Sequence, residues 1–216
     1  MFQKNKYICL SLLAVLFVST TISCATPAPK EKDENFLGDF NPVQLENLMA
    51  LTYNSVSGIK PLEVRAYLVP RTNTVELYFR ILTNEIALVL DKQTRDLIKS
   101  SAEQYLSLYE SDSLKRQNPS KKNAYVTGTM SLGWGLINAY RYTEAPFWTN
   151  YKIIDEKPYF MLYCLPTPDV NDSSAYSPLV EIYFSPSLLH DYLELAEQEN
   201  LKSIVDEFNT KAYTFE

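Results

Sequence analysis

The side chains that could do chemistry are few and widely spaced in this chain of 216 residues. His190 is the only histidine, and no Gly-x-Ser-x-Gly motif offers a serine nucleophile for it to activate. A zinc site needs several His, Cys or carboxylate ligands close together, which one histidine does not supply. We therefore expect His190 to be a solvated residue of a helix. We predict no catalytic residue, no metal ligand, no cofactor and no enzymatic activity.

Two short motifs have part of the spacing of a ligand-binding loop. Gly128 and Gly133 are spaced like two glycines of a phosphate-binding loop, but Trp134 occupies the position of the required lysine. The run Asp169–Asp172 has the oxygen-bearing side chains of a calcium loop but lacks its glycine and its distal glutamate. We predict that neither motif binds its ligand and that Asp169–Asp172 is a solvated loop.

Cys164 lies in the segment Pro158–Pro166, which is apolar on both faces. A reactive thiol needs an accessible, electropositive surrounding, and no basic residue lies in this segment. Unpaired cysteine is among the most buried residue types. We therefore predict that Cys164 is a buried core thiol.

The N-terminal segment has the three parts of a secretory signal. Lys4 and Lys6 make a positive start, Tyr7–Val18 is an apolar run, and Ser19–Ser23 consists mainly of small residues. Cys24 follows directly. A cysteine at this place resembles the lipobox of bacterial lipoproteins.

Thr21 stands where the lipoprotein family usually has Leu, and this relaxed form is similar to that of uncharacterised spirochaete lipoproteins. The resemblance implies that Cys24 becomes the first residue of the mature protein and carries acyl chains such as palmitate. Those chains would attach the protein to a membrane. A plain secretory signal and an uncleaved anchor are the alternatives, although the apolar run is shorter than the ~20 residues that span a bilayer.

Three segments follow from this interpretation. Residues 1–23 are predicted as the signal peptide, residues 24–35 as the acylated cysteine with a flexible tether, and residues 36–216 as one domain. The tether is rich in proline and then in charge, so it has no apolar face to bury. By resemblance to Gram-negative sorting, Ala25 after the acylated cysteine implies the outer membrane or the cell surface rather than the inner membrane.

The net charge limits the partners. The formal charge of the whole chain is −6, and loss of Lys4 and Lys6 with the signal makes the remainder more acidic still. An acidic body without a basic run argues against nucleic acid. It also argues against electrostatic docking on anionic lipid, so the acyl chains on Cys24 must supply the membrane attachment.

The pattern of apolar residues predicts an α+β fold. A short helix is expected from Asn41 to about Met49, because Asn41, Pro42 and Gln44 suit the first positions of a helix. Alternating apolar residues predict strands. The predicted strands cover 63–69, 74–83, 86–90, 126–134, 137–142, 148–154, 159–165 and 179–184. Helices are expected from Asp91 to Glu110 and from Ser185 onward, with a break near Asn200. We predict one antiparallel sheet of six to eight strands with two long helices packed on one face.

Two features leave alternatives open. The five residues Val75–Phe79 are similar to Val180–Phe184, and a long helix follows each segment within about a dozen residues. An internal duplication would explain this similarity, and so would chance, because strands favour the same residue types.

Aromatic residues also cluster in the second half. Trp134, Tyr140, Tyr142 and Trp148 are candidates for a ligand groove, and cross-strand aromatic pairing is the structural alternative. For Trp134 the alternation with Met130 and Leu132 favours the core.

We expect a non-enzymatic lipoprotein of the cell envelope that binds an envelope protein or supports an assembly. The alternative is a lipoprotein that binds a small ligand in the aromatic groove. A deep pocket lined by Trp134 and Trp148 would favour the ligand, and a flat aromatic patch would favour the protein partner.

Overall fold

The computed structural model describes residues 35–136 and 139–213, which belong to one unit, Glu34–Glu216. The predicted signal peptide, Cys24 and all of the predicted tether except Asn35 lie outside the described residues. The elements in chain order are β1 Val43–Gln44, β2 Leu48–Asn54, β3 Gly58–Val69, β4 Thr74–Ile81, β5 Asn84–Leu90, α2 Lys92–Glu110, the 3-10 helix η1 Lys121–Asn123, β6 Val126–Leu136, β7 Ala139–Ile154, β8 Lys157–Cys164, β9 Val180–Phe184, α3 Pro186–Ala196 and α4 Gln198–Tyr213.

The strands close into an antiparallel barrel of eight strands, so the predicted sheet with two long helices on one face is wrong. Neighbouring strands pair in chain order from β2 to β9, and β9 returns to β2 through the pair Leu51 and Tyr183. β1 pairs with β3 next to β2. Alternation along each strand shows which residues face inward, but closure depends on a pair that is far apart in sequence. The sequence pattern therefore predicts most of the strands but not the barrel.

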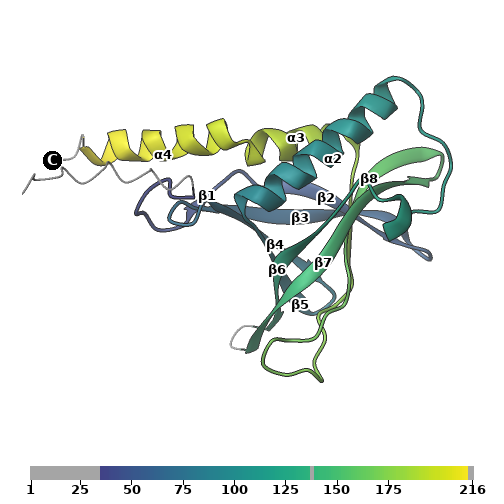
Figure 1. The fold of residues 1–216 in the computed structure, drawn as a ribbon, viewed down its shortest axis with the longest axis horizontal. Coiled ribbons are helices and arrows are strands. Elements are labelled where there is room, and N and C mark those ends of the chain that lie inside the picture. Colours follow the sequence, from purple (N-terminus) through teal and green to yellow (C-terminus); the bar gives the residue numbers. More distant parts are fainter. Residues whose placement is uncertain (1–34, 137–138, 214–216) are drawn as a thin grey trace, which may run out of the picture. The chain divides into compact units, whose positions relative to one another are not determined.

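Three helices lie at the barrel end where β5 and β9 finish, at the top of Figure 1. Asp91 caps α2, since its carboxylate accepts from the Thr94 backbone N–H, and Ser185 caps α3 in the same way through Leu188. The helix starts predicted at Asp91 and Ser185 are confirmed. The break predicted near Asn200 is confirmed three residues earlier, at Glu197, where the chain leaves helical geometry between α3 and α4. No helix within the described residues combines the length and apolar character needed to cross a membrane.

Two local predictions are wrong. The segment predicted as a helix from Asn41 to Met49 forms β1 and the start of β2. Pairing with β3 outweighs the helix-start residues, and it places Leu48 and Ala50 in the core at a spacing of two. The strands predicted at 137–142 and 148–154 are parts of one strand from Ala139 onward, β7, which continues through Pro146, and residues 137–138 lie outside the described residues.

The barrel interior is filled by apolar side chains from all eight strands, and α2 and α3 close it with Ile98, Tyr105, Leu189 and Tyr192. Cys164 is fully buried there, as predicted.

The chain order also shows an internal repeat of elements. Four strands and a helix, β2 to α2, are followed by four strands and a helix, β6 to α3. The similar segments Val75–Phe79 and Val180–Phe184 fall on the third strand of one half and the fourth strand of the other. They are therefore not at equivalent places.

Candidate functional site

Large apolar side chains are exposed in the β4–β5 turn, at the end of β6, near the start of β7 and in the β8–β9 connection, at the barrel end opposite the helices (Figure 1). Leu82 is 94% exposed, Leu136 62%, Tyr142 52%, Val170 65% and Tyr176 60%. We call these five residues the apolar end. Single exposed apolar residues are normal on a protein surface, but several on adjacent connections indicate a surface that binds something.

Strand register shows that these connections are neighbours. Leu82 lies in the β4–β5 turn beside the pair of Ile81 with Asn84. Leu136 ends β6, one residue after Gly135, which pairs with Glu85 on β5. The turn of one hairpin and the end of the next strand thus lie side by side.

The β8–β9 connection reaches the same place from the other side. The Val170 N–H donates to the Tyr142 carbonyl oxygen at 3.0 Å. The connection is a small hairpin in its own right, because Pro168 and Tyr176 form a bridge. Val170 and Tyr176 are therefore attached to the start of β7.

Asp169 holds this hairpin in place. Its carboxylate accepts from the Tyr142 N–H at 3.0 Å and from the Asn171 N–H at 2.8 Å. The Thr143 hydroxyl donates to the Pro168 carbonyl oxygen at 2.8 Å. Asp169 is buried rather than solvated, so the Asp169–Asp172 run is a device that fixes loop geometry.

Glycine makes room for the tyrosine pair at this end. The rings of Tyr140 and Tyr142 have centroids 5.5 Å apart. A Cβ on Gly133 would lie 2.7 Å from Tyr140 Cε1, so only glycine lets both rings lie over the strand. Burial, with a smaller effect of the Glu85 charge, raises the pKa of Tyr140 to about 12. The Tyr140 hydroxyl therefore stays neutral.

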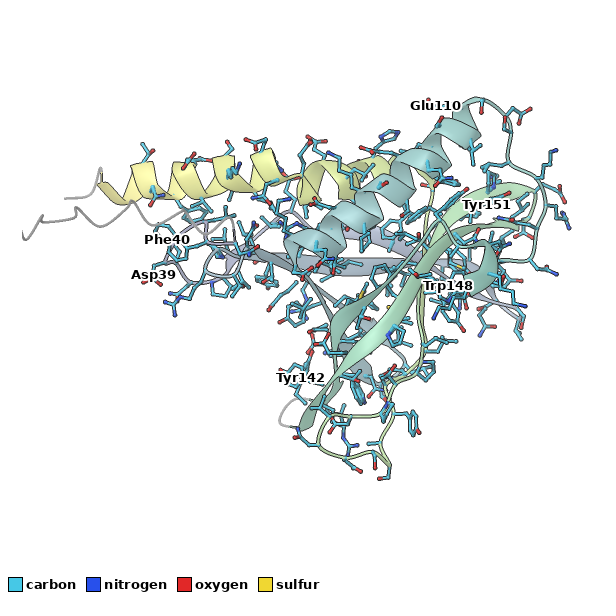
Figure 2. The ribbon with its side chains drawn as sticks, in the orientation of Figure 1. Asp39, Phe40, Glu110, Tyr142, Trp148 and Tyr151 are labelled. Carbon is cyan, nitrogen blue, oxygen red and sulfur yellow. The ribbon has the colours of Figure 1, made fainter. Side chains whose placement is uncertain are left out.

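The four predicted groove residues do not share one surface. Trp134 points inward and belongs to the barrel core. Trp148 points outward, belongs to a separate cluster with Met161 and Tyr183, and stacks on Tyr163 with ring centroids 4.7 Å apart. Tyr142 lies near the lower end of β7 and Trp148 further up the strand in Figure 2.

The cluster around Trp148 is held by a lysine. The Lys152 ammonium donates to the Tyr183 hydroxyl at 3.1 Å and lies 4.8 Å from the centre of the Tyr53 ring. The Glu181 carboxylate is 3.5 Å from the same ammonium. The Lys152 ammonium, the Tyr183 hydroxyl and the Glu181 carboxylate are thus paired with one another, so we assign the cluster a structural role on the outer face of the barrel.

The described residues offer little covalent or metal chemistry. No group of three or more His, Cys, Asp or Glu that could hold a metal lies within residues 35–136 and 139–213. Burial raises the pKa of Cys164 to about 12, so its thiolate form is suppressed at neutral pH. His190 is exposed on α3. The apolar end is suited to burying surface against a partner.

Sequence reasoning found Tyr142 and missed the other four members of the apolar end. Leu82 and Val170 are apolar residues at turn positions, next to Thr83 and between Asp169 and Asn171. Apolar residues in polar turns are a usable signal, because a turn does not bury them. Their gathering at one end follows only from the strand order.

The match to known proteins covers most of the chain. Residues 33–203 match a family described as "Uncharacterised Treponema protein", and the chain belongs to this family. It is 26% identical over 208 residues, 95% of this chain and 74% of the relative, to an uncharacterised protein of Treponema pallidum (strain Nichols). No solved structure matches. These matches support the resemblance to an uncharacterised spirochaete protein.

Proposed function

We propose that this member of the Treponema family is a non-enzymatic lipoprotein of the cell envelope, anchored through acyl chains on Cys24. In this proposal the apolar end binds an envelope protein, and the protein is exposed at the outer membrane or cell surface. The observation that supports the binding role is the exposure of Leu82, Leu136, Tyr142 and Val170 on neighbouring strand ends and connections.

The position of the tether favours a protein partner over the bilayer as the occupant of the apolar end. Asn35, the first described residue, lies beside Asp91 and Leu97 at the start of α2. An anchor on Cys24 would therefore join the domain at the end covered by helices. The apolar end lies at the other end of the barrel, where a partner in the envelope can reach it.

The alternative function is binding of a small ligand in an aromatic groove. Such a groove would need Trp134 and Trp148 on one surface, but they face opposite sides of β6 and β7. We therefore prefer the protein partner.

The binding role can be tested with a photo-crosslinking amino acid at Val170 in intact cells. We expect one discrete adduct, and Leu136→Asp in the same chain should abolish it because a charge cannot be buried unpaired in an apolar contact. The matched control is the same crosslinker at Tyr109, which is 43% exposed on α2, at the barrel end covered by helices. Equal adducts at Tyr109 and Val170 would refute the assignment.

The anchor is tested separately. Cys24→Ser should abolish palmitate labelling and leave unprocessed precursor, and unchanged labelling would refute the lipoprotein proposal. Protease digestion of intact cells tests surface exposure, because a protein at the surface is cleaved and one inside the envelope is protected.

A further inference from the structure

A second surface, independent of the apolar end, lies where the barrel closes. β2 pairs with β3 along its whole length, but on its other side it meets β9 only through Leu51 and Tyr183. From Val43 to Ala50, the edge that faces away from β3 has no strand partner within the described residues. This leaves roughly 25 Å of unpaired backbone at the seam of the barrel, which is strand in β1 and in Leu48–Ala50 and irregular between them.

A groove of about 450 Å³ runs between this edge and the helices α3 and α4. Its apolar lining includes Leu45 and Leu48 from the strand side and Leu188, Leu195 and Ile204 from the helix side. The size is that of a site for a small ligand or a short peptide.

The charged residues of the groove are all acidic. Glu46, Asp191 and Glu194 line it, and no lysine or arginine does. None of the three carboxylates forms an ion pair with any residue of the described part of the chain. The groove therefore has a negative potential that a cationic occupant would complement.

We propose that this groove binds a short extended segment of a partner protein in which apolar residues alternate with lysine or arginine. The segment adds as a strand to the free edge of β1 and β2, because an unpaired edge presents backbone donors and acceptors. Alternation at a period of two places its apolar side chains against Leu48 and Leu195. Its cationic side chains then face Glu46, Asp191 and Glu194.

The test measures binding of a fluorescent peptide, Lys-Leu-Lys-Val-Lys-Leu-Lys, to the full chain in non-ionic detergent. We expect saturable binding that weakens with added salt. Glu46→Gln, Asp191→Asn and Glu194→Gln should each weaken binding about 2- to 5-fold and together more than about 10-fold. The matched control is Asp206→Asn, which removes an exposed carboxylate of α4 that does not line the groove.

Two further peptides separate the parts of the proposal. The same peptide with glutamate in place of lysine should not bind. Methylation of alternate backbone nitrogens should also prevent binding, because it removes the donors needed for strand addition.

Several results would overturn the inference. Absence of saturable binding, equal binding by the glutamate peptide, or unchanged binding by the triple variant would refute the charge argument. Unchanged binding by the methylated peptide would refute strand addition. Displacement of the probe by a peptide of residues 25–34 would assign the groove to this chain's own tether rather than to a partner.

Discussion

Arg95 should be the polar side chain whose loss most destabilises the domain. Its residue is only 3% exposed. The guanidinium donates to the carbonyl oxygens of Asn73 and Leu90 at 2.6 and 3.1 Å, and to the side-chain oxygens of Asn73 and Gln198 at 2.9 and 2.8 Å. It thereby joins α2 to the β3–β4 turn, the end of β5 and the start of α4.

The size of the effect follows from these four contacts. A hydrogen bond to a charged group contributes roughly 1.5–3 kcal/mol, so the four together contribute roughly 6–12 kcal/mol. Burying the guanidinium costs several kcal/mol, and no carboxylate of a described residue pairs with it. The same burial lowers the pKa of Arg95, while the nearby charges of Asp96 and Asp91 raise it. We expect Arg95→Met to lower the free energy of unfolding by about 3–5 kcal/mol.

The assay is urea unfolding of the full chain followed by tryptophan fluorescence and circular dichroism. The control is Arg116→Met, since Arg116 is exposed and pairs with exposed Glu156 at 2.7 Å. Such a pair contributes about 0–1 kcal/mol. Gln198→Leu should cost less than Arg95→Met and should not add to it fully, because the two side chains share a hydrogen bond. If Arg95→Met were as stable as Arg116→Met, the bridging role would be refuted.

Three further outcomes are expected from the core. Trp134→Ala should cost about 3–5 kcal/mol in urea unfolding, and a native melting temperature would refute its core position. Gly128→Ala should destabilise, because the new Cβ would lie 2.5 Å from Phe147 Cε1; an unchanged urea midpoint would contradict this. Burial raises the thiol pKa of Cys164 to about 12 from an ordinary value of 9.0. The contribution of the protonated thiol to the free energy of unfolding is therefore intact below pH 9 and is lost as the pH rises toward 12. Unfolding free energies should therefore fall between pH 8 and pH 10 by about 1 kcal/mol more in wild type than in Cys164→Ala, and equal losses would refute the buried thiol.

Local signals in the sequence predicted the elements that depend on nearby residues. Asp91 and Ser185 cap helices, as their side chains and following residues suggest. Alternation identified β4, where Val75, Leu77 and Phe79 are buried. Helix caps and strand alternation depend on residues within a few positions of each other, so they can be predicted from the sequence alone.

The first predicted helix shows where local signals fail. Asn41 and Pro42 suit a helix start, yet the next residues pair with β3 and place Leu45 in the core. A propensity of a few tenths of a kcal/mol per residue is smaller than the gain from strand pairing and burial.

The candidate site shows the same limit. The sequence placed Tyr140 and Tyr142 with Trp134 and Trp148 in one aromatic cluster, but side chains that alternate along paired strands face opposite sides of the sheet. The pairing with Gly133 and Gly135 determined which side each residue faces.

The sequence by itself determined most of the strands, the starts of α2 and α3, the acidic charge and the burial of Cys164, because composition, periodicity and capping act over short distances along the chain. Only the tertiary structure decided the closure of the barrel, the gathering of Leu82, Leu136 and Val170 at one end, and the acidic groove at the seam. Those features depend on which distant strands pair, as Leu51 does with Tyr183. The free energy of that pairing comes from contacts summed over the whole fold, and no segment contains it alone.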